Sequence, residues 1–243
     1  MEALRAEGVC KSFQGNLAVD HASLTVEKGS ITGLIGANGA GKTTLFNCIS
    51  GYYPATSGKI YYRGKEVQHM SAQHLCHMGM ARTFQISKPF GNLSVLDNVV
   101  VGGYNHGASR QEAYRYAKES LEFVGLADKS EDLALRLNTG EQRKLELARA
   151  LATRPDLLLL DEVMAGLTPT ESAEMMTLIH KEKEKGTTIL MIEHIMPVIM
   201  QLSDKVYVME RGQVIAEGAP YEVANDPKVI ESYLGRSMEV EHA

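Results

Sequence analysis

The chain has 243 residues, enough to bury a substantial core in one domain or in one domain with an inserted lobe. Hydrophobic residues make up 44% of it and charged residues 23%, which is ordinary for a globular protein. The net charge of −5, from 25 basic and 30 acidic residues, gives no general attraction to nucleic acids or anionic lipids, so we expect no nucleic-acid partner.

The sequence predicts a protein that does not itself span a membrane. Its N-terminus lacks the apolar stretch of a signal peptide. The most apolar segments, residues 157–160 and 189–200, are cut by charged residues and fall short of the ~20 apolar residues that a membrane helix needs. The three cysteines are odd in number and show no C-x-x-C spacing, so we expect reduced thiols.

The N-terminal part of the chain has the pattern of antiparallel strands. Three segments alternate in polarity and are separated by turn residues, namely Leu4–Phe13, Ala22–Val26 and Lys59–Tyr62. Between the last two, Ile31–Ile35 is a short apolar strand that runs straight into a glycine-rich loop. Lys42–Ser50, which follows that loop, is predicted to be a helix.

The middle of the chain, from about residue 86 to 136, has helical spacing instead. Ser94–Val101 and Gln111–Val124 are predicted helices, with no buried strand apparent between them. A further helix is predicted from Gly140 to Ala152.

The last part of the chain returns to strands. These are predicted at Leu157–Leu160, Thr188–Ile192 and Lys205–Met209, with a helix at Ser172–Lys185 and short helices within residues 220–234. Because strands alternate with helices, we predict an α/β fold with a parallel sheet, interrupted by a helical lobe.

Residues 36–44 fit the pattern G-x-x-x-x-G-K-[ST] of a phosphate-binding loop. Glycines let the chain turn so that consecutive backbone N–H groups point at a phosphate, and the next helix adds the positive end of its dipole. Lys42 is expected to reach the β- and γ-phosphates and the Thr43 hydroxyl to ligate Mg²⁺. The predicted phosphate-binding residues are Gly36, Asn38, Gly39, Ala40, Gly41, Lys42, Thr43 and Thr44. The alternative, an incidental glycine loop, is disfavoured by the strand that precedes it.

Two carboxylates follow the apolar run 157–160, at the end of a strand where such sheets bind ligands. Asp161 is expected to hold Mg²⁺, directly or through water. Glu162 is expected to polarise the water that attacks the γ-phosphate. A strand that merely ends in charged residues is the alternative, and the phosphate loop upstream favours the catalytic interpretation.

Residues 137–143, which open a predicted helix, resemble the L-S-G-G-Q signature of the ATP-binding cassette (ABC) ATPases; we call them the signature segment. Asparagine replaces the serine and threonine replaces the first glycine. A glycine-bearing helix N-terminus offers N–H groups to a phosphate, so the resemblance makes Asn138, Gly140 and Glu141 nucleotide-binding residues. Without the resemblance, the segment would be an ordinary helix cap, with Asn138 or Thr139 capping.

Other landmarks of the same family follow in order. Phe13 resembles the aromatic residue that stacks on adenine, with a core aromatic as the alternative. Gln85 resembles the Q-loop glutamine that senses Mg²⁺ and the partner protein. Residues 165–169 resemble the D-loop and are called the D-loop segment below. His194 resembles the switch histidine that contacts the γ-phosphate, the alternative being a structural histidine.

The resemblance covers the chain from Leu4 to about Gly235. It implies a single nucleotide-binding domain over residues 1–243. Residues 1–85 and 154–243 would form a P-loop NTPase core with a parallel sheet and an N-terminal antiparallel β-subdomain. Residues 86–153 would form an inserted α-helical subdomain. The resemblance further implies that the chain binds ATP and Mg²⁺ and hydrolyses ATP. It also implies that the chain pairs with a second ABC ATPase subunit, identical or homologous. In such a pair, the signature segment of each subunit would cover the nucleotide bound to the other subunit.

Three segments, 81–85, 145–149 and 225–235, are similar to the ATPases of importers for branched-chain amino acids and related amides or urea. This implies an integral membrane permease, an extracellular solute-binding protein as an indirect partner, and a peripheral location at the cytoplasmic face of the inner membrane. Lipopolysaccharide-export ATPases, which share the tyrosine-leucine-glycine ending, are the runner-up. A further alternative is a soluble ABC ATPase of DNA repair, chromosome organisation or translation. Such proteins usually carry two cassettes in one chain or a long coiled coil, and this sequence shows neither, which disfavours that class. A non-catalytic regulator is disfavoured because Glu162 and His194 are retained.

The loop 86–91, between Gln85 and the first helix of the lobe, contains Phe90. We predict that short cytoplasmic helices of the permease seat in a groove lined by this loop and the helix Ser94–Val101. The alternative is that Phe90 anchors the lobe to the core, since buried aromatic residues are usually packing residues.

Overall fold

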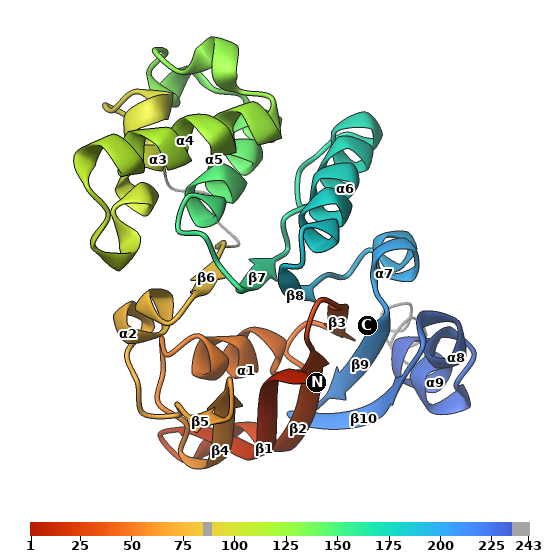
Figure 1. The fold of residues 1–243 in the computed structure, drawn as a ribbon. Helices are drawn as coiled ribbons and strands as arrows, with labels where there is room; N and C mark the ends of the chain where they lie inside the picture. The colour runs from red at the N-terminus through yellow and green to blue at the C-terminus, as the bar shows by residue number, and fades with distance from the viewer. Residues whose placement is uncertain (85–88, 235–243) are drawn as a thin grey trace. The chain divides into compact units, whose positions relative to one another are not determined.

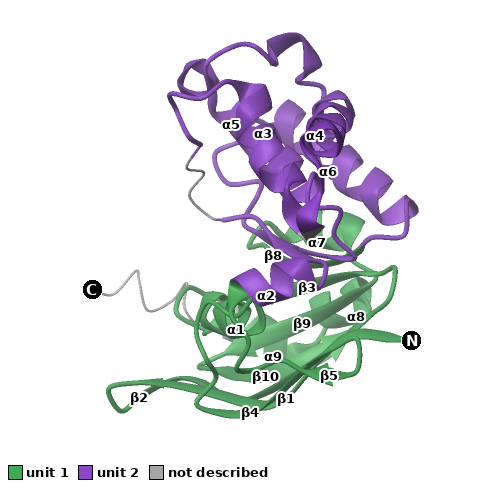
Figure 2. Ribbon diagram, turned by 60° about the vertical axis from the view of Figure 1, so that its left-hand side comes forward, with its two compact units in different colours: residues 1–72, 188–243 green, residues 73–187 purple. Residues whose placement is uncertain are grey.

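The computed structural model describes residues 1–84 and 89–234 and shows an α/β fold, as predicted (Figure 1). It contains two compact units (Figure 2). Unit 1 comprises residues 1–72 together with the chain from residue 188 onwards, and unit 2 comprises residues 73–187. The expected subdomain boundaries at residues 85 and 154 stay a prediction.

An antiparallel sheet forms the N-terminal part of unit 1. Its strands are β1 (Glu2–Phe13), β2 (Asn16–Glu27), β4 (Ser57–Tyr62) and β5 (Lys65–Glu66), in the order β2-β1-β4-β5. Alternate residues of β2, such as Leu24 and Val26, are buried, because one face of this sheet covers a core. The predicted antiparallel strands are thus confirmed, with β2 longer than expected.

A second sheet in unit 1 has parallel strands. These are β3 (Ile31–Gly36), β8 (Thr188–Ile192) and β9 (Lys205–Glu210), with β10 (Gln213–Gly218) antiparallel at the edge, in the order β10-β9-β3-β8. Every residue of β3 and β8 is buried, which is why each strand consists of apolar residues and glycine apart from a single threonine. The Tyr207 hydroxyl lies 3.0 Å from the Thr25 nitrogen and 3.2 Å from its carbonyl oxygen, and so links the two sheets.

The helices of unit 1 are α1 (Lys42–Ile49), α7 (Met196–Leu202), α8 (Pro220–Ala224) and α9 (Pro227–Leu234). Leu45, Phe46 and Ile49 of α1 are fully buried, as one face of an amphipathic helix should be. Helix α1 therefore holds the end of β3 and the loop that follows it against the core.

Unit 2 contains a pair of parallel strands and a helical lobe. The strands are β6 (Met80–Arg82) and β7 (Leu157–Asp161), and the helices are α2 (Ala72–His77), α3 (Val95–Gly103), α4 (Arg110–Val124), α5 (Thr139–Leu151) and α6 (Pro169–Glu184). Three of these helices begin with a capping box, in which a polar side chain and a glutamate three residues later satisfy each other's N–H groups. The pairs are Ser109 and Glu112, Asn138 and Glu141, and Thr168 and Glu171.

The described part of the chain contains no helix that is both long and apolar enough to cross a membrane. The three cysteines are free thiols, as predicted.

Candidate active site

The loop of residues 36–44 joins β3 to α1 within unit 1. Its two outer glycines adopt positive φ angles, 150° at Gly36 and 98° at Gly41. A Cβ atom at these positions would lie 2.2 Å from the Met209 carbonyl oxygen and 2.5 Å from the Ala18 carbonyl oxygen, respectively. Both positions therefore require glycine, because a side chain would clash with the main chain of a neighbouring strand.

Lys42 is the first residue of α1 and lies under this loop. Its ammonium group donates hydrogen bonds to the carbonyl oxygens of Gly36, at 2.7 Å, and of Ala37, at 3.1 Å. Only 5% of the Lys42 surface is exposed, whereas Asn38 and Thr43 are exposed. The loop thus curls around a buried positive charge, and Thr43 lies exposed next to it.

The N-terminus of α1 differs from those of α4, α5 and α6. Its N-cap residue is Gly41, which has no side chain to accept a hydrogen bond, and its first turn contains no acidic residue. The other three helices carry both a capping side chain and a glutamate there. Within α1 itself, neither a capping side chain nor an acidic first-turn residue therefore competes with an anion at the helix start, where the helix dipole and Lys42 both favour negative charge.

His194 follows β8, which pairs with β3 in parallel, with Ile192 opposite Leu34. Because both strands run in the same direction, His194 and the phosphate loop extend from the same edge of the sheet. His194 is exposed, and Glu193 before it is fully buried. The exposed imidazole is accessible to a ligand, and the role of His194 as the switch histidine stays a prediction.

The two predicted catalytic carboxylates lie at the end of β7 in unit 2. Asp161 is 2% exposed, and its carboxylate forms an ion pair with Arg82 at 2.8 Å. Its N–H donates to the Thr83 hydroxyl at 3.1 Å. Glu162 is half-buried and has a φ angle of 49°, which non-glycine residues adopt rarely. The chain therefore turns sharply directly after an aspartate that is held in place.

The signature segment begins α5, and its side chains cap that helix. The Asn138 side chain accepts from the Glu141 N–H at 2.9 Å, and the Glu141 carboxylate accepts from the Asn138 N–H at 3.0 Å. Glu141 also pairs with Lys129, and these contacts, the one to Lys129 first, lower the pKa of Glu141 below its usual value. Asn138 is thus the N-cap, as the capping interpretation predicted. Because the capping box uses the N–H groups of Asn138 and Glu141, those of Thr139 and Gly140 are the ones suited to a phosphate.

Phe13 ends β1 and is 41% exposed, so it is not the core aromatic of the alternative interpretation. Its ring packs edge-on against Tyr53, with 5.4 Å between centroids, and the Lys11 ammonium lies 5.0 Å from its centroid. The ring is accessible for stacking.

Gln85, the remaining predicted site residue, lies outside the described residues.

Arg82, Arg143 and Glu146 contact the site region but were not predicted as site residues. Arg143 and Glu146 are 8% and 9% exposed on α5, among apolar neighbours. The sequence does contain a signal for this pair, since two charged residues three positions apart stand among apolar residues of a predicted helix. It does not reveal what they contact, because their partners are far away along the chain.

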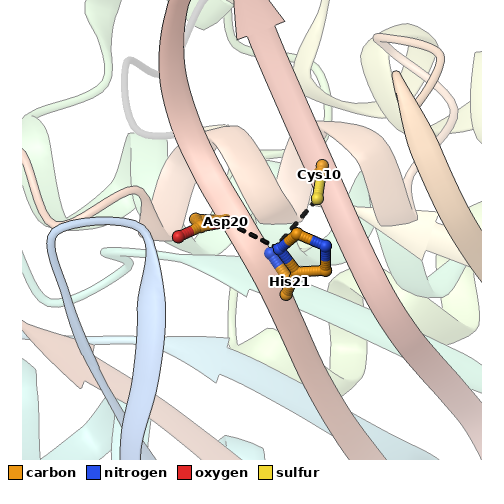
Figure 3. Close-up of side chains that lie close together, drawn as sticks. All are labelled: Cys10, Asp20 and His21. Carbon is orange, nitrogen blue, oxygen red and sulfur yellow. Dashed lines mark hydrogen bonds and ion pairs between the residues drawn. The ribbon is translucent and has the colours of Figure 1, made fainter.

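Within residues 1–84 and 89–234, one group of three side chains has metal-ligand chemistry, namely Cys10, Asp20 and His21, whose ligand atoms lie within 4.8 Å of one another (Figure 3). The Cys10 sulfur accepts from the His21 N–H at 3.2 Å, and Asp20 lies 2.7 Å from Nδ1 of His21. Since Asp20 and Nδ1 of His21 already bond each other, and the Cys10 sulfur accepts from the main-chain N–H of His21, we assign no metal to this group.

Comparison with known proteins identifies relatives over nearly the whole chain. The sequence profile of the ABC transporter family matches residues 19–165, and that of the branched-chain amino acid ATP-binding cassette transporter matches residues 213–238. The chain is 39% identical to the high-affinity branched-chain amino acid transport ATP-binding protein LivG of Salmonella typhimurium, over 96% of this chain and 98% of that protein. It is 37% identical to the corresponding protein BraF of Pseudomonas aeruginosa, over 96% and 98%. The crystal structure of a nucleotide-free ATP-binding cassette from an ABC transporter is similar, with a TM-score of 0.88 and 35% identity over 96% of this chain and 99% of that one.

Proposed function

The chain belongs to the ABC transporter family, and we propose that it is the ATP-hydrolysing subunit of an importer for branched-chain amino acids or a similar small solute. The observation that carries the ATPase assignment is the uncapped start of α1, where Lys42 lies under a loop that requires glycine at Gly36 and Gly41. The similarity to LivG and BraF over nearly the full chain supports the substrate class and does not favour a lipopolysaccharide exporter.

Nucleotide binding is assigned to unit 1. We expect the N–H groups of residues 38–44 and the Lys42 ammonium to hold the phosphates, and Phe13 to stack on the adenine. Lys42→Ala should weaken ATP binding about 10- to 100-fold, because hydrogen bonds to charged groups contribute about 1.5–3 kcal/mol each. Titration with a fluorescent ATP analogue measures this affinity, and an unchanged value would count against the phosphate-loop assignment.

Hydrolysis needs Mg²⁺, and the donors present fit this ion because hydroxyl and carboxylate oxygens are the ligands that it prefers. Thr43 and Asp161 would hold it, with Gln85 as a further ligand, and the ion would neutralise charge on the phosphates. We expect Glu162 to act as the base that orients and deprotonates the attacking water, and His194 to contact the γ-phosphate.

We propose that the working unit is a dimer of two ABC ATPase subunits, identical or homologous. The N–H groups of Thr139 and Gly140 would then face the γ-phosphate bound to the other subunit. Glu141 would repel that phosphate if its carboxylate pointed toward it, but its pairing with Lys129 and the Asn138 N–H directs it to the cap. ATP favours the closed dimer because its γ-phosphate contacts both halves, and hydrolysis removes those contacts.

A permease is the proposed partner of the helical lobe, which would place the subunit at the cytoplasmic face of the membrane. Large apolar side chains are exposed around the loop before α3 and on that helix, namely Phe90 at 47%, Leu93 at 41% and Val101 at 50%. The main chain of Phe90 is held by the buried Asn98, and its ring centroid lies 4.8 Å from the Arg149 guanidinium carbon, so the ring is not the sole anchor of the loop. Apolar side chains of this kind suit the cytoplasmic helices of a membrane protein.

Two experiments test this proposal. The chain, co-purified with its permease and reconstituted in vesicles, should import leucine, isoleucine or valine when ATP and the solute-binding protein are present. If the vesicles take up only amides or urea, the chain would instead be the ATPase of one of the related amide or urea importers. Phe90→Ala should leave ATP binding intact and reduce permease assembly or transport, whereas normal transport by this variant would remove Phe90 from the docking surface.

A further inference from the structure

Three consecutive residues at the end of β6 connect two parts of unit 2. Arg82 forms its ion pair with Asp161, and the Thr83 hydroxyl accepts from the Asp161 N–H. The Thr83 N–H also donates to the Leu159 carbonyl oxygen at 2.9 Å. Phe84, the next residue, bonds instead to helix α5. Residues 82–84 therefore tie the carboxylate end of β7 to the helix that begins with the signature segment.

Both polar groups of the Phe84 main chain are held by side chains of α5. The Phe84 N–H donates to Oε1 of Glu146 at 2.5 Å, and its carbonyl oxygen accepts from Nη1 of Arg143 at 3.2 Å. Arg143 and Glu146, three residues apart on one face of the helix, also pair with each other at 3.5 Å. The Phe84 ring is 52% exposed, so the main chain, not the ring, is what α5 holds.

The same helix reaches the D-loop segment. Nη2 of Arg143 donates to the Ala165 carbonyl oxygen at 3.4 Å. In the first turn of α5, a Cβ atom added to Gly140 would lie 2.2 Å from a carboxylate oxygen of Glu171, which caps α6 directly after the D-loop segment. Arg143 thus bonds to main-chain oxygens on both sides, one beside Gln85 and one in the D-loop segment.

Stability alone does not account for two charged residues buried here. Burial raises the pKa of Glu146 despite the opposing Phe84 N–H and Arg143, so the carboxylate is held at a desolvation cost. Apolar residues of similar volume usually stabilise a buried site as well as an ion pair does. What apolar residues cannot do is fix the direction of two main-chain groups with directional hydrogen bonds.

We infer that Glu146 and Arg143 are positioning residues that hold the main chain entering Gln85 in a fixed register with the signature helix and the D-loop segment. The inference rests on the proposed function, since it concerns the glutamine that senses Mg²⁺ and the partner. Through this pair, a displacement of α5 moves Phe84 and Ala165 together.

The test compares Glu146→Ala, Glu146→Gln and Arg143→Lys with a matched control, Glu182→Ala. Glu182 is also a buried glutamate of unit 2, at 7% exposure, but it bonds to the Thr187 hydroxyl at 2.7 Å and not to Phe84. Amide exchange of residues 82–84, kcat, KM for ATP, the Mg²⁺ concentration for half-maximal hydrolysis and the melting temperature are measured for each.

Glu146→Ala should speed amide exchange at Phe84 and lower kcat by about 10- to 100-fold, the scale of a small misplacement of a catalytic group. It should raise the Mg²⁺ requirement while KM for ATP changes less than about threefold, since the phosphate loop is in unit 1. Glu146→Gln, whose amide oxygen still accepts from the Phe84 N–H, should recover most of kcat. Arg143→Lys should change amide exchange, kcat and the Mg²⁺ requirement in the same direction as Glu146→Ala, but by less. The inference is overturned if Glu146→Ala and Glu182→Ala lose activity alike, or if Phe84 exchange does not change. If Glu146→Ala fails to fold, Arg143→Lys decides: a normal kcat together with unchanged amide exchange at Phe84 in this variant overturns the inference.

The proposed function is tested separately in the same assays. A wild-type chain that does not hydrolyse ATP would contradict the ATPase assignment, while the amide exchange of Phe84 would still report on the contact with Glu146.

Discussion

Replacing Asn98 by alanine should release the loop that precedes α3 and separate the two possible roles of Phe90. Asn98 is fully buried, and its side chain makes three hydrogen bonds to main-chain groups. It accepts from the Phe90 N–H at 2.8 Å and donates to the carbonyl oxygens of Phe90, at 3.0 Å, and Ser94, at 2.9 Å.

The magnitude follows from what each partner retains. The Phe90 carbonyl oxygen also accepts from the Leu93 N–H and the Ser94 carbonyl oxygen from the Asn98 N–H, so both keep one bond in the variant. The Phe90 N–H loses its acceptor. Three bonds at about 1 kcal/mol each, partly offset by water reaching the loop, give a loss of about 2–3 kcal/mol in the free energy of unfolding. Phe90→Ala should cost only about 1 kcal/mol, because the ring is half exposed.

Guanidinium unfolding measures both losses, and amide exchange at residues 90–94 shows where they arise. Asn105→Ala is the matched control, since Asn105 also donates to two main-chain oxygens of unit 2, those of Cys76 and Thr153, but does not contact Phe90. It should leave exchange at Phe90 unchanged. The reasoning fails if Phe90→Ala is the more destabilising variant, because the ring would then be the anchor of the loop.

Three further changes probe the phosphate loop and the signature segment. Thr43→Ala should raise the Mg²⁺ concentration for half-maximal hydrolysis, with little change in nucleotide affinity without Mg²⁺; an unchanged requirement would contradict its role as ligand. Gly41→Ala should abolish ATP binding in calorimetry while circular dichroism stays native, because its Cβ would meet the Ala18 oxygen, and normal binding would disprove the required turn. The contact with Lys129 lowers the pKa of Glu141 from the ordinary value of 4.5. The contact therefore stabilises the folded protein fully above pH 4.5, and this stabilisation is lost as the pH falls through the lower pKa that Glu141 has in the folded state. Glu141→Gln should therefore flatten the fall in unfolding free energy between about pH 5 and 3, Lys129→Ala should do the same, and an unaltered slope would refute it.

Local patterns explain why so much of the fold was predictable. The strand β8 was predicted with its observed bounds, since Thr188 followed by four buried apolar residues admits few other interpretations. The helices α3 and α5 were predicted to begin at Ser94 and Gly140, each within one residue of the observed start, because Ser94 and Asn138 cap them through their own side chains. The phosphate loop was recognisable because its chemistry lies within nine consecutive residues.

Other elements were missed for physical reasons. The strand β6 has three residues, and β10 lies at a sheet edge with a half-exposed, irregular pattern, so neither has a clear period. Helix α7 carries Pro197 in its first turn and has seven residues. The contact between Phe84 and Glu146 joins residues 62 apart, and that between Arg82 and Asp161 joins residues 79 apart. No periodicity encodes such pairs, because the topology of the fold decides which segments meet.

The most direct test of the central claim is ATP turnover and self-association of Glu162→Gln beside the wild-type chain. The glutamine variant should bind ATP with near-normal affinity, hydrolyse it about 10²–10⁴-fold more slowly, and accumulate as an ATP-dependent dimer in analytical ultracentrifugation. Near-normal hydrolysis by this variant, with no dimer that depends on ATP, would contradict the assignment of Glu162 as the catalytic base and of the chain as a dimeric ABC ATPase.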